Sequence, residues 1–390
     1  MMKKREEQKK PVIAVIGLKG LPAFGGSARA GENMIAYLKN EFQFVVFNTS
    51  SHTSRRTGTY GGIRQVVFRK FFISPLNTIY YYLFSTFYCL FRGGFDVIHV
   101  FHVDASFIVP LLRLRYRVVA GHRARPQYAD KWNPIIRHYF RFMEWLFFKW
   151  PAHVLTSVNR EVIDIFSLRT RRQIFCFPNG VDLNNVRDLP EVEERDYVLF
   201  ASGRVIAAKG AHLMLEALNQ IHYQGRALVI GNRHHAPEYS LQLEKLAEPL
   251  NVRFMDIIKD KRQLMAWLKN ARMFVFPSYH EGMSNMLLEA ASVGVPVICS
   301  DIPGNRQVFN DDEAFFFQSG NAADLARKIQ YVLTHPEYAA TTAERGYERL
   351  NREYNWENLS QRYAGIYKWL MRNRKPLNKE NSEVSDLLEV

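Results

Sequence analysis

Residues 273–300 read MFVFPSYHEGMSNMLLEAASVGVPVICS, and this stretch decides the fold class. Met273–Phe276 and Val295–Cys299 are short apolar runs bounded by turn residues, which predicts two buried strands. Between them, leucines and alanines give an apolar face to a helix that we expect to begin near Ser284. A strand, a helix and a second strand in this order form a βαβ unit, in which the two strands are parallel.

The same alternation of short apolar runs and helix-length amphipathic stretches fills most of the remaining sequence. Helices fit between the runs, for example at Ala28–Leu38 and Ile135–Lys149, and the chain after Asn321 is helical in pattern. Apolarity on successive residues predicts strands buried on both faces, as in parallel sheets. The other predicted strands are Val12–Ile16, Phe44–Phe47, Gln65–Phe68, Val97–Val100, Arg117–Ala120, His153–Thr156, Gln173–Phe177, Tyr197–Ala201, Ala227–Ile230 and Val252–Phe254.

A length of 390 residues favours two domains. The series of strands is broken by the turn signal Pro178-Asn179-Gly180 and by the polar, acidic stretch Asp188–Asp196. The predicted fold is therefore α/β, with two tandem Rossmann-like doubly wound domains and a cleft between them as the expected ligand site. We expect a disordered N-terminus at 1–10, domains at 11–188 and 189–355, a helix at 356–372 packing back toward the first domain, and a disordered tail at 373–390.

The composition restricts the partners and the compartment. A net charge of +14 and an isoelectric point of about 9.6 favour polyanionic partners: nucleotide phosphates, nucleic acid or an anionic membrane surface. The three cysteines, Cys89, Cys176 and Cys299, form no Cys-x-x-Cys pair, so neither a zinc site nor a disulfide scaffold is expected and a cytoplasmic location fits. The first apolar run is too short for the core of a signal peptide.

The segment Phe71–Phe91 contains 21 residues without a charge, long enough to span a bilayer. It also contains Pro75, Asn77 and four tyrosines, and tyrosine prefers a membrane interface. Three interpretations stay open: a helix of the domain core, a helix at the membrane surface, and a membrane span.

The first candidate ligand loop is Gly17–Gly26, GLKGLPAFGG, directly after the first predicted strand. Glycines let backbone amides approach a phosphate, and the following helix directs its positive N-terminus toward it. The spacing does not match the dinucleotide fingerprint G-x-G-x-x-G. Gly25 and Gly26 fit a phosphate or sugar loop, and the alternative is a long connection with turn glycines.

The second candidate loop is Gly203–Gly210, GRVIAAKG, after the first strand of the second domain. Arg204 and Lys209 suit a diphosphate, since arginine offers a bidentate fork and lysine a mobile point charge. The alternative is a pair of solvated surface cations.

The third candidate is Pro277–Ala290, where Glu281 precedes Gly282 and seven residues separate it from Glu289. Carboxylates accept hydrogen bonds from sugar and ribose hydroxyls, and the helix start near Ser284 exposes amides to an anion. The alternative is an acid at a helix start and an ordinary surface glutamate. All three candidates follow predicted strands, where open α/β sheets bind ligands.

With these motifs, and with PNGVD at 178–182 and the segment 276–304, the chain resembles the retaining GT-B glycosyltransferases of family 4 over residues 12–369. The resemblance implies a nucleoside-diphosphate sugar donor. It implies that Gly25 and Gly26 lie near the donor phosphate, that Arg204 and Lys209 neutralise the diphosphate, and that Glu281 contacts the donor sugar. It further implies that Glu289 holds the ribose and that backbone amides of the segment Gly282, Met283, Ser284, Asn285 and Met286 bind the donor.

His122, in VVAGHRAR, matches a family histidine near the anomeric carbon. A histidine there can hydrogen-bond the sugar or polarise the reacting face. Related polysaccharide enzymes often carry Asp-Gly at this place, and His99 and His102 are competing candidates. The other interpretation is a loop histidine without a catalytic role.

The resemblance implies transfer with retention, from a nucleotide sugar to a saccharide acceptor. We expect no metal and no other cofactor, because no Asp-x-Asp-like pair ends a strand and Asp311-Asp312 fits a turn. The first domain is rich in cations and aromatic residues, for example at 137–150. This composition suggests a peripheral enzyme on the inner face of the cytoplasmic membrane, acting on a lipid-linked saccharide in capsule, exopolysaccharide or lipopolysaccharide synthesis.

Three alternatives remain open at this stage. A basic nucleic-acid-binding protein is suggested by charge alone, and no RNP-like strand, zinc spacing or helix-turn-helix signal supports it, so no nucleic-acid partner is expected. A GT-B sugar-nucleotide epimerase would convert the donor without an acceptor. A non-catalytic regulatory subunit would bind the nucleotide sugar without turnover.

Overall fold

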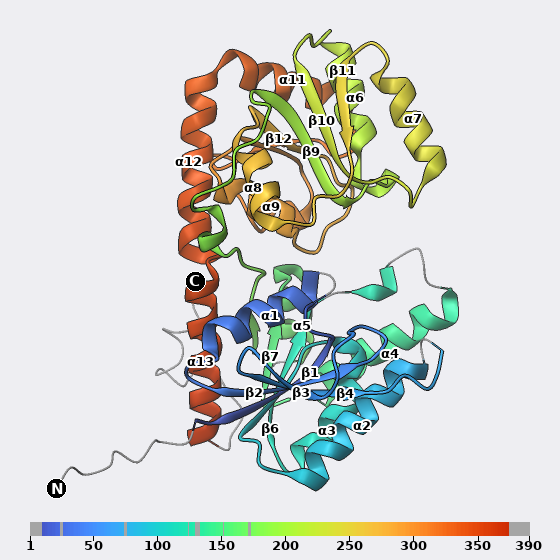
Figure 1. Cartoon of the computed structure of the whole chain (residues 1–390), viewed down its shortest axis with the longest axis vertical. Helices are drawn as coiled ribbons and strands as arrows, with labels where there is room; N and C mark the ends of the chain where they lie inside the picture. Colours follow the sequence, from blue (N-terminus) through green and yellow to red (C-terminus); the bar gives the residue numbers. More distant parts are fainter. Residues whose placement is uncertain are drawn as a thin grey trace, which may run out of the picture. The chain divides into compact units, whose positions relative to one another are not determined.

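The computed structural model describes residues 10–373, apart from 24–25, 74–75, 124, 129–132, 151 and 171–172. The chain forms two compact units (Figure 1): Met1–Pro178 together with Trp356–Val390, and Asn179–Asn355. The boundary falls after residue 178, before the predicted one, because Val181 already pairs with Asn355 and packs into the core of the second unit. The expected disordered ends, apart from Lys10 and Asn373, lie outside the described residues.

The first unit contains an eight-stranded sheet in the order β3-β4-β2-β1-β5-β6-β7-β8. Its strands are parallel except for the β3–β4 pair. Their bounds are β1 Val12–Lys19, β2 Gln43–Thr49, β3 Gly58–Tyr60, β4 Ile63–Phe68, β5 Val97–Val100, β6 Arg117–His122, β7 Val154–Ser157 and β8 Ile174–Cys176.

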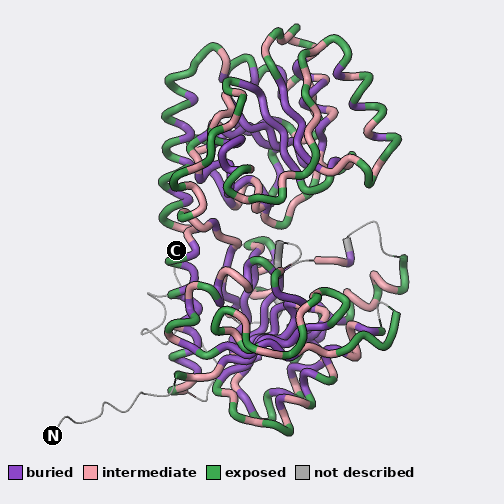
Figure 2. Tube along the Cα trace, in the orientation of Figure 1, coloured by how far each residue is buried: buried purple, intermediate pink, exposed green. Residues whose placement is uncertain are grey.

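Helices cover both faces of this sheet, and the strands between them are buried (Figure 2). Helices α1 (Gly26–Leu38) and α13 (Trp356–Arg372) pack on one face, where Tyr367 of α13 bonds to His99 Nδ1 of β5 at 2.7 Å. The opposite face carries α2 Leu76–Arg92, η1 Val103–Ile108, α3 Val109–Arg113, α4 Pro134–Lys149 and α5 Arg160–Thr170, and the short turn η2 spans Pro126–Tyr128.

The second unit contains a six-stranded, fully parallel sheet in the order β11-β10-β9-β12-β13-β14. The strands are β9 Tyr197–Arg204, β10 Arg226–Asn232, β11 Asn251–Met255, β12 Met273–Phe276, β13 Val297–Ser300 and β14 Phe315–Phe317. The helices are η3 Leu183–Val186, η4 Ala207–Lys209, α6 Ala211–Gln220, α7 Pro237–Ala247, α8 Lys261–Lys269, α9 Asn285–Ser292, α10 Pro303–Arg306, α11 Ala322–Thr334 and α12 Pro336–Glu353.

Two doubly wound α/β units in tandem are therefore confirmed. In each sheet the first strand lies in the middle and the chain turns back past it, so the strand order reverses between β1 and β5 and between β9 and β12. Ligands bind beyond the carboxyl ends of the strands at such switch points. The loops after these four strands are therefore the places to look for a site.

The uncharged segment Phe71–Phe91 forms most of α2, a helix of the first unit with one buried side that includes Tyr81, Tyr82 and Cys89. No helix in the described part of the chain is long and apolar enough to cross a membrane. From Leu76 on, this segment is a helix of the first unit with one side in the core.

Candidate active site

In the second unit, the loops after β9 and β12 touch each other at the switch point. The Tyr279 amide donates to the Ala208 carbonyl at 3.1 Å. Gly210 between η4 and α6 has φ +75°, and a Cβ on it would lie 2.1 Å from the Pro277 carbonyl oxygen. Only glycine permits both the left-handed backbone and this close approach. Gly210 therefore allows the loops after β9 and β12, which contain the two predicted sites of this unit, to pack against each other.

This contact brings Lys209 and Glu281 together. Lys209 Nζ lies 2.5 Å from Glu281 Oε1, with the side chains 25% and 11% exposed. The lysine predicted to hold a diphosphate and the glutamate predicted to hold the donor sugar therefore lie at one place. Arg204 is exposed at the end of β9, and the described residues include no ion pair with it.

The segment from Gly282 to Asn285 is fixed through its carbonyl groups. Gln307 donates to the Gly282 carbonyl, and Asn179 Nδ2 donates to the Met283 carbonyl at 3.3 Å. Ser284 occupies the N-cap of α9 without a side-chain hydrogen bond to the first turn. The amides at this helix start therefore lack a cap from Ser284, which suits an anionic or hydroxyl-bearing ligand.

Glu289 lies inside α9 and is only 8% exposed, so it is not an ordinary surface glutamate. Its carboxylate forms an ion pair with Lys261, the first residue of α8. Lys261 was not among the site residues predicted from the sequence. The available signal was Asp260, whose carboxylate caps α8 and so places residue 261 in the first turn of that helix.

A second group outside the predicted site residues connects α6 to the loop after β12. His212 Nδ1 contacts the Tyr239 hydroxyl at 2.8 Å, and His212 Nε2 contacts the Tyr279 hydroxyl at 3.2 Å. Burial lowers the pKa of His212, which favours the neutral ring. The contacts of His212 join α6 to Tyr239 of α7 and to Tyr279 in the loop after β12.

In the first unit, Gly25 lies outside the described residues, and Gly26 is the first residue of α1. Gly17, the first residue of the predicted loop, lies within β1, which extends to Lys19. The Tyr81 hydroxyl of α2 accepts a hydrogen bond from the Gly17 amide at 2.8 Å and so joins this part of β1 to α2. The predicted phosphate role of Gly25 and Gly26 stays a prediction.

His122 is the last residue of β6, not a loop residue, and is 1% exposed. Its Nε2 lies 2.9 Å from Glu144 Oε1, and Arg125 Nε donates to the same oxygen at 3.1 Å. Burial raises the pKa of Glu144, but the contacts with His122 and Arg125 outweigh it and bring the pKa below its usual range. The ionised carboxylate thus holds the proton on Nε2 of His122.

The two competing histidines have different surroundings. His99 is buried in β5 against Tyr367, and burial lowers its pKa. His102 follows β5 at the switch point, and burial lowers its pKa to about 4. Both rings are therefore neutral at pH 7. His102 precedes Asp104, a residue that sequence analysis did not select.

Asp104 is the center of a polar cluster at the β1/β5 switch point. Lys19 Nζ lies 3.3 Å from Asp104 Oδ2, the Tyr82 hydroxyl donates to Asp104 Oδ1 at 2.9 Å, and the Tyr139 hydroxyl donates to the Asp104 carbonyl at 3.1 Å. Burial would raise the pKa of Asp104, but Lys19, His102 and Tyr82 together lower it. The cluster joins β1, η1, α2 and α4, and it can bind hydroxyl or phosphate groups.

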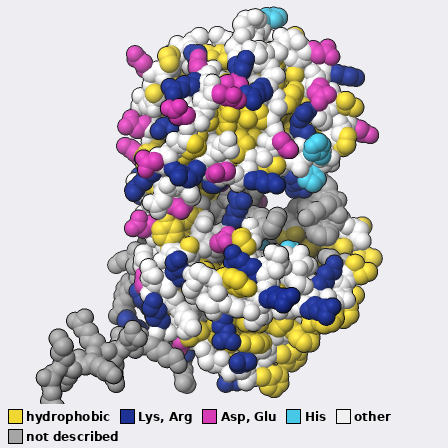
Figure 3. Space-filling model, viewed as in Figure 1, with side chains coloured by type: hydrophobic (Ala, Val, Ile, Leu, Met, Phe, Trp, Pro, Cys, Tyr) yellow, Lys and Arg dark blue, Asp and Glu magenta, His cyan; other side chains and the backbone are white. Residues whose placement is uncertain are grey.

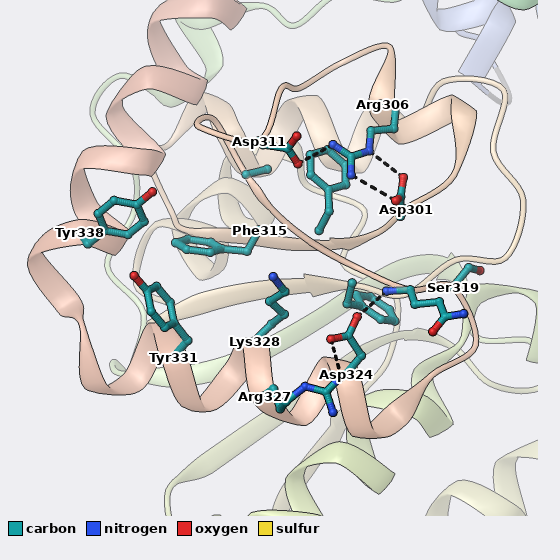
Figure 4. A pocket seen from close by; sticks show the side chains of 14 residues that line it. Asp301, Arg306, Asp311, Phe315, Ser319, Asp324, Arg327, Lys328, Tyr331 and Tyr338 are labelled. Carbon is teal, nitrogen blue, oxygen red and sulfur yellow. Dashed lines mark hydrogen bonds and ion pairs between the residues drawn. The ribbon is translucent and has the colours of Figure 1, made fainter.

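Two hollows of the second unit involve none of the predicted site residues. A pocket of about 860 Å³ lies along β14 and α11 (Figure 4), where Arg306 is neutralised by Asp301 and Asp311. A pocket of about 460 Å³ follows β10 and β11 and includes Arg233 and Asp256. The larger volume is no argument for the first pocket, because the predicted residues converge at the β9/β12 switch point.

Metal independence stays a prediction. Asp311 pairs with Arg306 at 2.6 Å, and Asp312 lies 3.8 Å from Arg345. Among the described residues, no group of three or more His, Cys, Asp or Glu side chains is placed to hold a metal ion.

Comparison with solved structures identifies the fold. The chain superposes on the crystal structure of HepE from Anabaena in complex with UDP-glucose, with a TM-score of 0.70 and 15% identity, over 93% of this chain and all of the other. This likeness concerns the fold: the two Rossmann-like units make a GT-B fold.

Residues 184–349 match the family model described as glycosyl transferases group 1. This match covers most of the second unit, so the similarity to the group 1 glycosyl transferases lies there. The chain is similar to the capsular polysaccharide biosynthesis glycosyltransferase CapM of Staphylococcus aureus, with 26% identity over 50% of this chain and 55% of CapM. It is also similar to the N,N'-diacetylbacillosaminyl-diphospho-undecaprenol alpha-1,3-N-acetylgalactosaminyltransferase of Campylobacter jejuni, with 22% identity over 57% of this chain and 62% of that enzyme. The chain spans about half the length of the curated relatives it matches.

Proposed function

We propose that this chain transfers a sugar from a nucleoside-diphosphate sugar to a hydroxyl group of a saccharide acceptor, with retention of the anomeric configuration. The Lys209–Glu281 pair at the β9/β12 switch point is the observation that carries the proposal. The family match of the second unit and the UDP-glucose bound to the similar HepE structure support a nucleotide-sugar donor.

Each predicted site residue of the second unit then has a distinct role. Lys209 and Arg204 neutralise the diphosphate as it leaves, and preorganised cations stabilise such developing charge strongly. Glu281 accepts hydrogen bonds from hydroxyls of the donor sugar. Glu289 accepts hydrogen bonds from the ribose, in exchange for part of its contact with Lys261. Amides at the start of α9 bind the donor.

The bonds that change are the glycosidic bond to the donor phosphate, which breaks, and the bond from the acceptor oxygen to the anomeric carbon, which forms. Retention follows from attack on the same face as the departing phosphate. The acceptor proton passes to the leaving phosphate oxygen, so no metal ion and no protein nucleophile is needed. In the first unit we assign His122 to the sugar, with Glu144 holding its ring.

For the acceptor we propose a lipid-linked saccharide in capsule, exopolysaccharide or lipopolysaccharide synthesis. The printed names of the S. aureus and C. jejuni relatives, which refer to a capsular polysaccharide and a diphospho-undecaprenol saccharide, support this class. The free thiols Cys89, Cys176 and Cys299 fit a reducing compartment, and we place the reaction at the inner face of the cytoplasmic membrane.

A thermal-shift screen with UDP-, GDP-, ADP- and dTDP-sugars tests donor binding, because a ligand that binds the folded state raises the melting temperature. One nucleotide series should raise it for the wild type and for the control K245M, an exposed lysine of α7, but not for K209M. An equal shift for K209M would refute the donor site. Turnover without acceptor would instead indicate an epimerase, and binding without any turnover a regulatory subunit.

A further inference from the structure

Helix α2 exposes a stripe of large apolar side chains. Leu76, Phe84, Phe87 and Phe91 are 59%, 47%, 47% and 84% exposed and recur at intervals of three, four or eight residues, on one side of the helix. Phe71, Phe72 and Ile73, just before the helix, are 63%, 47% and 81% exposed. The opposite side of α2 is buried in the core of the first unit. Core packing therefore explains one side of α2, and the apolar side chains of the other side are exposed to solvent.

Helix α4 has a similar exposed side. Ile135, Phe142 and Trp145 are 80%, 51% and 48% exposed, and the rings of Phe142 and Trp145 stack with centroids 5.6 Å apart. Leu111 and Leu114, in and just after α3, are also exposed. Helices α2, α3 and α4 all contact η1, so they lie on the same face of the sheet (Figure 1). Apolar and cationic side chains gather on this part of the first unit in Figure 3.

We call the exposed apolar residues in or next to α2, α3 and α4, together with the exposed cations in or next to these helices, the basic-aromatic face. Helices α2, α3 and α4 contain a single carboxylate, Glu144, and it is buried against His122. Exposed cations in or next to these helices are Arg69, Lys70, Arg92, Arg113, Arg115, Arg141 and Lys149. The described part of these helices therefore presents positive charge without an exposed acid.

The combination of exposed apolar side chains and positive charge distinguishes between the possible binding partners of this face. A second copy of the same face would bring like charges together, which is unfavourable without acidic partners. An anionic leaflet attracts lysine and arginine, while phenylalanine, leucine and tryptophan enter the boundary between headgroups and acyl chains. A large exposed apolar patch marks an interaction site in general. Charge complementarity then selects the lipid surface.

We propose that the basic-aromatic face binds the surface of an anionic lipid bilayer, with Phe87, Phe91 and Trp145 inserted between the headgroups. The polar cluster of Lys19 and Asp104 is built in part by Tyr82 of α2 and Tyr139 of α4. The helices that bind lipid thus also shape a polar site of the first unit. This arrangement brings the membrane close to a site that suits the headgroup of a lipid-linked saccharide. The last point rests on the proposed function, whereas the lipid contact itself does not.

Co-sedimentation with vesicles tests the proposal without donor or acceptor, so that its failure would leave the proposed reaction intact. The wild type should bind vesicles of phosphatidylcholine and phosphatidylglycerol at low salt, and bind phosphatidylcholine alone at least tenfold more weakly. The variant F87S/F91S should lower binding to the anionic vesicles at least tenfold. L168S/L241S removes two leucines, 83% and 60% exposed, outside this face and should bind like the wild type.

Each other result overturns the proposal. No binding of the wild type to anionic vesicles would do so directly. Equal binding by F87S/F91S and the wild type would show that the apolar residues do not enter the lipid. If the wild type is a dimer in solution that F87S/F91S converts to a monomer, while neither binds vesicles, the face contacts a second copy. Melting temperatures within a few degrees of the wild type establish that both variants are folded.

Discussion

Replacing Glu281 by glutamine tests the candidate donor site most directly. The substitution keeps the shape of the side chain, removes its charge and leaves Lys209 without the carboxylate that now lies 2.5 Å from its Nζ. A hydrogen bond to a charged group contributes about 1.5–3 kcal/mol. If Glu281 holds the donor sugar in the transition state, kcat/KM should fall about 10- to 150-fold, at about 1.4 kcal/mol per factor of ten.

The effect on stability should be smaller. Exposed ion pairs contribute about 0.2–1 kcal/mol, and this pair is partly exposed, with 25% of the lysine side chain open to solvent. A loss of about 1 kcal/mol lowers the melting temperature of a domain of this size by about 2–4 °C. A large loss of activity with a small loss of stability would therefore separate a role in the reaction from a role in folding.

The assay measures initial rates of nucleoside-diphosphate release and of product formation with the donor found by the thermal-shift screen. E238Q, which changes an exposed glutamate of α7, serves as the control and should keep the wild-type rate. K209M should lower kcat by about 10²–10³-fold, since it removes a cation that stabilises the leaving group. The double variant should lose much less than the sum of the two free energies, because residues in contact are not independent. A loss within about threefold for E281Q, roughly 1 kcal/mol or less, would refute the assignment.

Three further measurements test other parts of the structure. G210A should destabilise the second unit by at least about 1 kcal/mol more than G294A in urea unfolding. Both glycines have φ near +70°, but only a Cβ at Gly210 would clash with a backbone atom, the Pro277 carbonyl oxygen at 2.1 Å. Equal losses of stability would contradict the tight contact between the loops. The pKa of Glu144 is lowered in the folded protein from an ordinary value of 4.5, so its carboxylate stabilises the fold above that pH, and this contribution is lost as the pH falls through the folded pKa. The difference in unfolding free energy between the wild type and E144Q should therefore be constant from pH 6 to 8 and shrink below about pH 4.5. A difference that grows in acid would contradict this sign. EDTA should leave the initial rate of transfer unchanged, whereas activity lost to EDTA and restored by Mn²⁺ would end the metal-free mechanism.

Most strands of both sheets could be predicted because parallel strands are buried on both faces and so appear as continuous apolar runs. Strand β14, Phe315–Phe317, was missed although its three residues are buried, because the run is very short. The predicted bounds of Val97–Val100 and Met273–Phe276 coincide with β5 and β12. The edge strand β3, Gly58–Tyr60, was missed because its side chains are partly exposed and follow no apolar pattern. A signal was present, since Gly61-Gly62 joins β3 to β4 with φ of +58° and +81°, as a two-residue hairpin requires.

The candidate site was predictable only in part, for a different physical reason. That a loop follows a strand can be inferred from the sequence, and this placed Lys209 and Glu281 at the carboxyl edge of one sheet. Their direct contact joins residues 72 positions apart and depends on the strand order, which no local pattern contains. The same holds for Glu289 and Lys261, whose pairing requires α8 and α9 to be neighbours.

Strand order also bears on which residues of the first unit are candidates for the site. The family resemblance selects His122 as the histidine near the reacting carbon. That ring lies at the end of β6, one strand beyond the switch point, and a buried carboxylate already occupies its Nε2. At the switch strands, Lys19 ends β1 and Asp104 follows β5, and these two residues form the Lys19–Asp104 cluster. Because both sheets reverse their strand order next to their first strand, the equivalent positions of the two units are the Lys19–Asp104 pair and the Lys209–Glu281 pair. Each pair joins a lysine at the end of the first strand or shortly after it to a carboxylate that follows the neighbouring strand across the reversal. Topology therefore makes the Lys19–Asp104 pair a candidate site of the first unit, in addition to the histidine that the family resemblance selects.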